Sequence, residues 1–137
     1  MKKIYFLAIL LSLTIPNIYA QVAIIANKGV SANSVSIAQL KNLYTLQSSE
    51  LNSQKVRLYF LTNEGSTLST FLKGIGENNG DLKKQWLKAK LTGGSTPPEP
   101  VSSEDDVLSK VSSTAGAIGF ISADKVNSNV KVLLEIK

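Results

Sequence analysis

A short polar segment in the middle of the chain, Thr62 to Thr67, carries residue types that bind small anions. Gly65, Ser66 and Thr67 stand at the expected start of a helix, where hydroxyl groups and free backbone N–H groups favour negative charge. Asn63 is close enough in sequence to add an outer contact. Gly65, Ser66, Thr67 and Asn63 are therefore the candidate ligand-binding residues for a small oxyanion. The alternative is ordinary helix capping, which Ser and Thr supply at many helix starts.

The chain contains neither His nor Cys, and this excludes several kinds of chemistry. Without Cys there is no disulfide, no thiolate nucleophile and no lipid-attachment cysteine. Without His the commonest general base and the commonest transition-metal ligand are both missing. A serine nucleophile would need a lysine base, and no lysine stands out by its spacing from Ser66. We therefore expect a binding protein rather than an enzyme, with no catalytic residue, no metal site and no cofactor.

Two charged clusters each allow a functional and a structural interpretation. The lysines at 83, 84, 88 and 90 could attract anions or an acidic partner through a positive potential, but they are typical of the solvated face of an amphipathic helix. Glu104, Asp105 and Asp106 could form a carboxylate or metal site. The place of these acidic residues in a first helical turn is better explained by the helix dipole. We favour the structural interpretation of both clusters.

Hydrophobic patterning predicts four strands that alternate with helices. The strands are expected at 22–26, 56–61, 115–121 and 130–136, and the helices at 36–46, at 68–75, from Asp81 to Gly93, and from Ser103. This order indicates an α/β domain with a mostly parallel sheet flanked by helices. Ligands of such sheets bind beyond the carboxyl ends of the strands, so Thr62 to Thr67 lie at the expected functional edge.

Local signals refine the predicted elements. Ser36 and Gln39 have capping-box spacing, and Ser103 with Asp106 repeats it. Asp81 is expected to cap the helix that ends at Gly93. The helix that starts at Ser36 is expected to bury Ile37, Leu40, Leu43 and Tyr44 on one face.

The remaining segments are assigned from composition and alternation. The polar stretch 47–54 and the Pro-rich stretch 95–100 are expected to be loops. The last strand is expected to place Val130, Val132, Leu134 and Ile136 on one face. Trp86 follows Leu82 at helical spacing and is expected in the core. Gly116 and Gly119 are expected to mark a close backbone approach or a bend in their strand.

The first twenty residues have the three parts of an export signal. Lys2 and Lys3 precede an apolar run, which is followed by small or neutral residues up to Ala20. A membrane anchor is the rival interpretation, but it needs about 20 apolar residues, and Pro16 ends the run early. We therefore expect a signal peptide at 1–20 and one α/β domain at 21–137, periplasmic or secreted, with no transmembrane segment after cleavage.

The formal charge is mildly positive and does not indicate a nucleic-acid partner. It is +5 for the whole chain and falls to +3 without Lys2 and Lys3, because all ten acidic residues lie beyond the signal.

Several motifs occur in the order and spacing found in one known family. They are Val22 to Asn27, Val35 to Tyr44, Glu64-Gly65-Ser66-Thr67 ahead of Phe71, Trp86, Gly93-Gly94 before Pro97-Pro98, and Ala115 to Phe120. The last of these is the most specific. Together they make the chain resemble type II periplasmic solute-binding proteins. The likeness is greatest to the phosphate-binding proteins of phosphate ABC transporters and their small single-domain relatives.

The resemblance implies an extracytoplasmic solute-binding protein for phosphate or a similar small oxyanion, working with a membrane transporter. In that family the anion-binding turn reads Arg, any residue, Asp-Gly-Ser-Gly-Thr. Here Gly65 and Ser66 match, Glu64 replaces Asp, Thr67 follows without the second Gly, and Thr62 stands at the Arg position. The bidentate clamp that Arg gives a phosphate is therefore missing.

The mature length corresponds to only one of the two lobes that close around the ligand in full-length family members. A bound anion would then stay partly exposed. The alternative function is an envelope interaction or sensory module that kept the fold but lost the solute site. Such a module would act on a sensor, a transporter or a surface-assembly partner.

Overall fold

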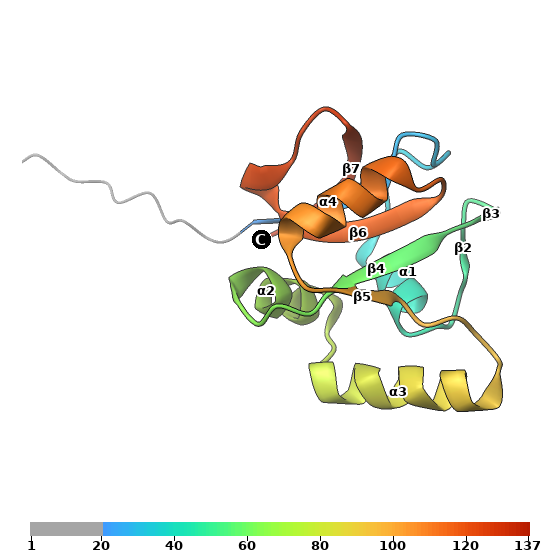
Figure 1. Cartoon of the computed structure of the whole chain (residues 1–137). Coiled ribbons are helices and arrows are strands. Elements are labelled where there is room, and N and C mark those ends of the chain that lie inside the picture. Colours follow the sequence, from blue (N-terminus) through green and yellow to red (C-terminus); the bar gives the residue numbers. More distant parts are fainter. Residues whose placement is uncertain (1–20) are drawn as a thin grey trace, which may run out of the picture.

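The computed structural model describes residues 21–137, so the predicted signal peptide at 1–20 lies outside the described residues. A five-stranded sheet forms the centre, in the order β5 (Glu99–Val101), β4 (Arg57–Leu61), β6 (Ala117–Ser122), β1 (Val22–Asn27), β7 (Val130–Ile136) (Figure 1). β4 pairs in parallel with β5 and β6, whereas β1 is antiparallel to both β6 and β7. Four strands thus point one way, and the predicted mostly parallel sheet is confirmed.

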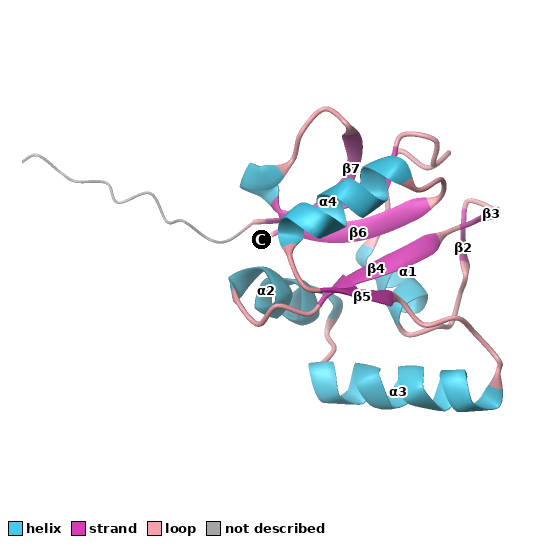
Figure 2. Ribbon diagram, viewed as in Figure 1, coloured by secondary structure: helices cyan, strands magenta, loops and turns pink. Residues whose placement is uncertain are grey.

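Four α-helices flank the sheet (Figure 2). They are α1 (Ile37–Tyr44), α2 (Ser66–Ile75), α3 (Asn79–Thr92) and α4 (Glu104–Ser113), and a short 3₁₀ turn, η1 (Ala123–Lys125), follows β6. Neighbouring residues of β6 show which helix covers which face, since side chains alternate along a strand. Gly119 faces Val107 and Val111 of α4, whereas Phe120 stacks on Phe71 of α2. Figure 1 shows α3 running beside the β5 edge.

An aromatic cluster fills the space between the sheet and helices α1, α2 and α3. Phe71 and Phe120 stack with ring centroids 3.8 Å apart, Tyr44 meets Phe71 edge-on at 5.0 Å, and Trp86 meets Phe60 at 4.7 Å. The Trp86 Nε1–H donates to the Tyr44 carbonyl oxygen at 2.8 Å. Trp86 is thus a core contact, as predicted, and it attaches α3 to the body of the domain.

Tyr44 is the most deeply enclosed polar side chain of this cluster. Its ring is fully buried, and its hydroxyl donates to the Tyr59 carbonyl oxygen at 2.8 Å. Burial raises the pKa of the Tyr44 phenol far above its usual value, because a buried phenolate would lose its hydration. The hydrogen bond satisfies the buried hydroxyl, so the ring belongs to the core despite its polar atom.

Gly119 of β6 and Gly116, the residue directly before β6, confirm the predicted close backbone approaches. A Cβ at Gly119 would lie 2.8 Å from Val107 Cγ1 and 3.1 Å from Val111 Cγ2, so only Gly lets α4 pack this closely. Gly116 has a φ of +74°, and a Cβ there would lie 3.2 Å from the Lys55 carbonyl oxygen. Both glycines set the path of the strand.

Two of the predicted helix caps are confirmed, and a third is wrong. Ser36 and Gln39 form the reciprocal capping box, and Ser103 accepts from the Asp106 N–H at 3.2 Å. The prediction that Asp81 caps α3 is wrong, because Asn78 is the N-cap and accepts from the Asp81 N–H at 2.8 Å. Asn is among the best N-cap residues, so α3 begins two residues before Asp81.

One residue of α1 departs from its predicted face. Ile37 was expected on the buried face with Leu40, Leu43 and Tyr44, yet it is 39% exposed while the other three are buried. Ile37 is the first residue of α1, where the chain is still entering the helix, so helical spacing does not place it against the core.

Two predicted loops contain strands. β2 (Glu50–Leu51) and β3 (Gln54–Lys55) form a small hairpin that overlaps the predicted loop at 47–54, and β5 forms at the end of the Pro-rich stretch. The turn residues Asn52 and Ser53 both have positive φ, which fits a two-residue hairpin turn. Pro100 is tolerated in β5 because β5 is an edge strand.

The predicted face of β7 is also corrected. Val132 is 36% exposed and Leu133 is buried, so the simple alternation fails. In the pairing of β1 with β7, Ile24 lies opposite Leu134 and the next residue, Ile25, lies opposite Val132. Leu133 is therefore an extra residue of β7 without a partner in β1. A β-bulge of this kind breaks the alternation of side chains.

Residues 21–137 contain a hydrophobic core of their own. Every strand of the sheet contributes to it, and it extends from Val22 to Ile136. No helix among residues 21–137 is long and apolar enough to span a membrane.

Candidate functional site

Three parallel strands end at one edge of the sheet, and the segments that follow them form the candidate site. β4 leads into Thr62 to Thr67, β5 leads into α4 at Glu104, and β6 leads into Ser122 and η1. Hydrogen bonds join these segments, because the Glu104 Oε1 atom accepts from both the Thr67 hydroxyl and the Ser122 backbone N–H. The edge of the sheet where the sequence predicts the site is therefore a continuous surface, formed by segments that hydrogen bonds hold together.

The N-terminus of α2 differs from those of the other α-helices in residues 21–137. Side chains of Ser36, Asn78 and Ser103 cap α1, α3 and α4, whereas Gly65 gives α2 no side-chain cap. The first backbone N–H groups of an α-helix have no intrahelical partner, so at α2 they are available to a ligand or to water. A Cβ placed on Gly65 would meet nothing within 4 Å, which shows how open this point is.

The four predicted site residues fall into two environments. Asn63, Gly65 and Ser66 are exposed, and they lie together where the turn after β4 leads into the first residue of α2. Thr67 is buried, with 8% of its surface exposed, and its hydroxyl donates to Glu104 Oε1 at 3.0 Å. The structure therefore keeps the first three open to solvent and engages the Thr67 hydroxyl within the protein.

Glu104 is the residue of this edge for which the sequence analysis favoured the helix dipole over a carboxylate or metal site. It is the first residue of α4, and its side chain is 17% exposed. Besides accepting from Thr67 and Ser122, it lies 3.7 Å from the Lys125 ammonium group. No direct sequence signal indicated this role, because the stretch that contains β5 was expected to be a loop and Glu104 was marked only by its place at a predicted helix start. Glu104 thus holds the ends of β4, β5 and β6 together.

The charge at this edge is mainly negative. Asp105 lies 3.9 Å from Lys125 but is 88% exposed, and exposed pairs of this kind contribute little. Glu64 is exposed on the turn itself, one residue before Gly65. The site can therefore offer backbone N–H groups and the Ser66 hydroxyl to a small ligand, while nearby carboxylates disfavour additional negative charge.

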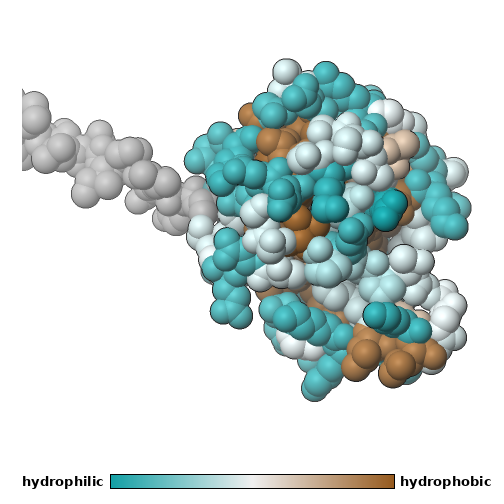
Figure 3. All heavy atoms as spheres, in the orientation of Figure 1, coloured by the Kyte–Doolittle hydropathy of each residue, from teal (hydrophilic) through white to brown (hydrophobic). Residues whose placement is uncertain are grey.

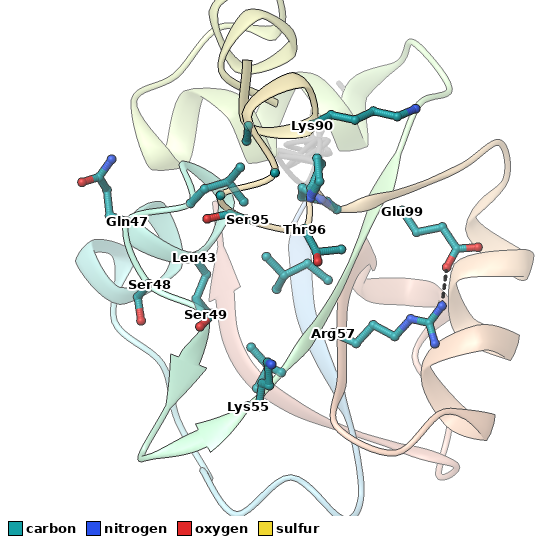
Figure 4. Close-up of a pocket in the computed structure, with 18 of the residues that line it drawn as sticks. Leu43, Gln47, Ser48, Ser49, Lys55, Arg57, Lys90, Ser95, Thr96 and Glu99 are labelled. Atoms are coloured by element: carbon teal, nitrogen blue, oxygen red, sulfur yellow. Dashed lines mark hydrogen bonds and ion pairs between the residues drawn. The ribbon is translucent and has the colours of Figure 1, made fainter. Parts of the chain in front are cut away.

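A separate hollow of about 1260 Å³ opens at the opposite end of β4 (Figure 4). It lies between the end of α3, the segment after it and the start of β4, and Lys55, Arg57 and Lys90 line it. Arg57 is paired with Glu99 at 3.3 Å. Because this hollow is at the amino end of β4, it does not include the predicted site residues.

No family model and no curated protein sequence matches this chain. Solved structures do match its fold. A protein of Clostridium perfringens, assigned as a phosphate ABC transporter substrate-binding protein and solved with bound phosphate, aligns with a TM-score of 0.68 at 18% identity. An ABC-type phosphate transport receptor from Vibrio cholerae aligns with a TM-score of 0.61 at 20% identity. PstS from Borrelia burgdorferi aligns with a TM-score of 0.59 at 13% identity.

These matches cover most of this chain but about half of each solved protein. The first two cover 84% of this chain and 45% and 47% of the others, and the third covers 83% of this chain and 47% of PstS. The resemblance expected from the sequence motifs is therefore confirmed at the level of the fold, which is that of one lobe of a periplasmic binding protein. The solved proteins are binding proteins and receptors by name.

Proposed function

We propose that residues 21–137 act outside the cytoplasm, in the periplasm or as a secreted protein, and bind phosphate or a similar small oxyanion at the N-terminus of α2. The observation that carries the proposal is that α2 begins at the carboxyl end of β4 without a side-chain cap. Free N–H groups at such a helix start bind anions in many α/β proteins. The phosphate-related names of the proteins that share this fold support the same ligand class.

In the proposed binding mode the anion contacts the open turn. Backbone N–H groups at the start of α2 and the Ser66 hydroxyl donate to the ligand, and Asn63 adds an outer contact. Gly65 allows a close approach because nothing lies within 4 Å of its Cβ position. Thr67 contributes through its backbone, since its hydroxyl is engaged by Glu104.

The same geometry sets an upper limit on affinity. Thr62 stands at the family's Arg position, so no guanidinium neutralises the ligand there. Glu64 and Glu104 add negative charge beside the turn, and residues 21–137 by themselves leave a ligand at this exposed turn partly in solvent. We therefore expect salt-sensitive binding in the millimolar range, on the order of −4 kcal/mol. In a cell, a transporter subunit or a second lobe would complete the site.

Thermal unfolding of residues 21–137 with increasing phosphate tests this function. Phosphate at 100 times its dissociation constant should stabilise the domain by about 2.7 kcal/mol, a shift of several degrees. Chloride at matched ionic strength should give no saturable shift, and sulfate reports whether the site accepts other oxyanions. Ser66→Asp should abolish the effect, because its carboxylate occupies the place of the ligand. Ser109→Asp on the exposed side of α4 is the matched control and should leave the shift unchanged.

The contact between Thr67 and Glu104 favours a second candidate function. The Glu104 carboxylate accepts the hydrogen bond that the Thr67 hydroxyl would otherwise donate to a bound anion. We would expect such a contact in a domain that has kept the fold but no longer binds a solute. In that case the domain is an envelope interaction or sensory module acting on a sensor, a transporter or an assembly partner. A flat response to tens of millimolar phosphate, in the wild type and in Glu104→Gln, would reject the oxyanion site and leave this function. A specific partner should then be recovered from envelope extract, and recovery of none would contradict it.

A further inference from the structure

The outer face of α3 carries the two most exposed large hydrophobic side chains in residues 21–137. Leu87 is 57% exposed and Leu91 is 78% exposed, while Leu82 and Trp86 on the same helix face the core. Leu87 and Leu91 are four residues apart and so lie one above the other on the helix. α3 is therefore apolar on two opposite faces, of which only one is covered by the domain.

The net positive charge of the domain comes from the same helix. Residues 21–137 contain thirteen Lys and Arg against ten Asp and Glu, and α3 holds four of those lysines and one of those acidic residues. The rest of the domain has nine of each and is formally neutral. The entire excess of +3 therefore belongs to a single helix.

The lysines of α3 lie on both sides of the exposed leucines. At 100° per residue, Leu87 and Leu91 form a narrow stripe, with Lys83 and Lys90 on one side and Lys84 and Lys88 on the other. All four lysines are exposed. In Figure 3 a hydrophobic patch bordered by hydrophilic side chains occupies the lower edge of the molecule, where Figure 1 places α3.

We propose that this face of α3, made of Leu87, Leu91 and their four flanking lysines, binds the surface of an anionic lipid bilayer. Helices that lie in a membrane interface insert a strip of apolar side chains and surround it with Lys or Arg. Lysine stems extend along apolar surface and carry the ammonium group to the headgroups. Leu87 and Leu91 are 57% and 78% exposed, so within residues 21–137 this face is free to meet a flat surface.

The dimensions of the stripe favour a bilayer over a protein groove. A helix that docks in a groove presents apolar anchors over several turns, typically at i, i+3, i+4 and i+7. The outer face of α3 presents one leucine pair only, and its charges are arranged on both sides of it. A surface of uniform negative charge complements that arrangement without a shaped cavity.

Cosedimentation of residues 21–137 with vesicles tests the proposal. This segment contains its own core, and it omits the apolar run at 4–15 that would itself bind lipid. We expect binding to vesicles of 30% phosphatidylglycerol and 70% phosphatidylcholine, and at least tenfold less to pure phosphatidylcholine. Binding should weaken as salt is raised.

Two double variants assign the binding to α3. Each lysine near an anionic surface contributes about fivefold in partitioning, so Lys84→Gln with Lys88→Gln should lower it about 25-fold. Leu87→Ser with Leu91→Ser should lower it at least tenfold. Lys28→Gln with Lys73→Gln removes the same charge from exposed positions elsewhere and should lower it less than fivefold. Urea denaturation of each variant checks that the domain remains folded.

Three outcomes would overturn the proposal. The first is an absence of binding to anionic vesicles at low salt, and the second is an equal loss in the control double variant. The third is concentration-dependent self-association without vesicles that is lost in the leucine double variant, because the leucines would then contact a second copy of the chain.

Discussion

Replacing Glu104 should destabilise the domain more than replacing any other acidic residue at the candidate site. Its carboxylate accepts hydrogen bonds from the Thr67 hydroxyl and the Ser122 N–H, and 17% of the side chain is exposed. Hydrogen bonds to a charged group contribute about 1.5 to 3 kcal/mol each, and the partial exposure reduces this. The pair with Lys125 adds little, because that lysine is 45% exposed. We expect Glu104→Ala to cost about 2 to 4 kcal/mol.

Urea denaturation monitored by far-UV circular dichroism measures this cost through the shift of the midpoint at an unchanged slope. Asp105→Ala is the matched control, since Asp105 is the next residue of α4 and is 88% exposed. It should change stability by less than about 0.5 kcal/mol. Glu104→Gln keeps an acceptor oxygen and should fall between the two. If Glu104→Ala unfolds at the wild-type midpoint, the carboxylate does not hold the strand ends together and the argument fails.

Three further substitutions test the core. Gly119→Ala should cost about 1 to 3 kcal/mol in urea denaturation, because its methyl group would lie 2.8 Å from Val107 Cγ1; an unchanged midpoint would show that α4 moves away freely. Trp86→Phe removes the hydrogen bond to the Tyr44 carbonyl, so trypsin should cleave α3 several-fold faster, and equal cleavage would contradict this. Burial raises the Tyr44 pKa, so above pH of about 10 the unfolded chain loses this proton first. Wild-type stability should then fall by up to about 1.4 kcal/mol per pH unit more steeply than that of Tyr44→Phe, and parallel slopes would refute the assignment.

The longer elements could be predicted from the sequence because local signals and burial agree there. The start of α1 is marked by its capping box. The strands β1 and β4 are marked by apolar runs that are buried along almost their whole length. The short elements depend on other parts of the chain. β5 has three residues and exists because β4 offers it a parallel partner, and the Asn52-Ser53 turn lacks the glycine that usually marks such a hairpin.

The candidate site was predicted in position but not in its internal contacts. Gly65 and Ser66 follow directly after a buried strand, so their place at the sheet edge can be predicted from the local sequence alone. The partner of Thr67 could not be predicted, because Glu104 lies 37 residues away and reaches it only after β5 has paired with β4. The bulge at Leu133 is a similar case, since it depends on the register with β1 rather than on β7 alone.

The place of β1 in the sheet has a consequence for when the domain can fold. β1 is the first strand of the chain, and its two neighbours, β6 and β7, are the last two. Val22 pairs with Ser122 and Ile136, about 100 residues further along. Loops of this length close slowly, so the sheet cannot form until almost the whole chain is available. During synthesis β1 is therefore expected to stay unpaired until β6 and β7 have been made, although it is the first strand to leave the ribosome.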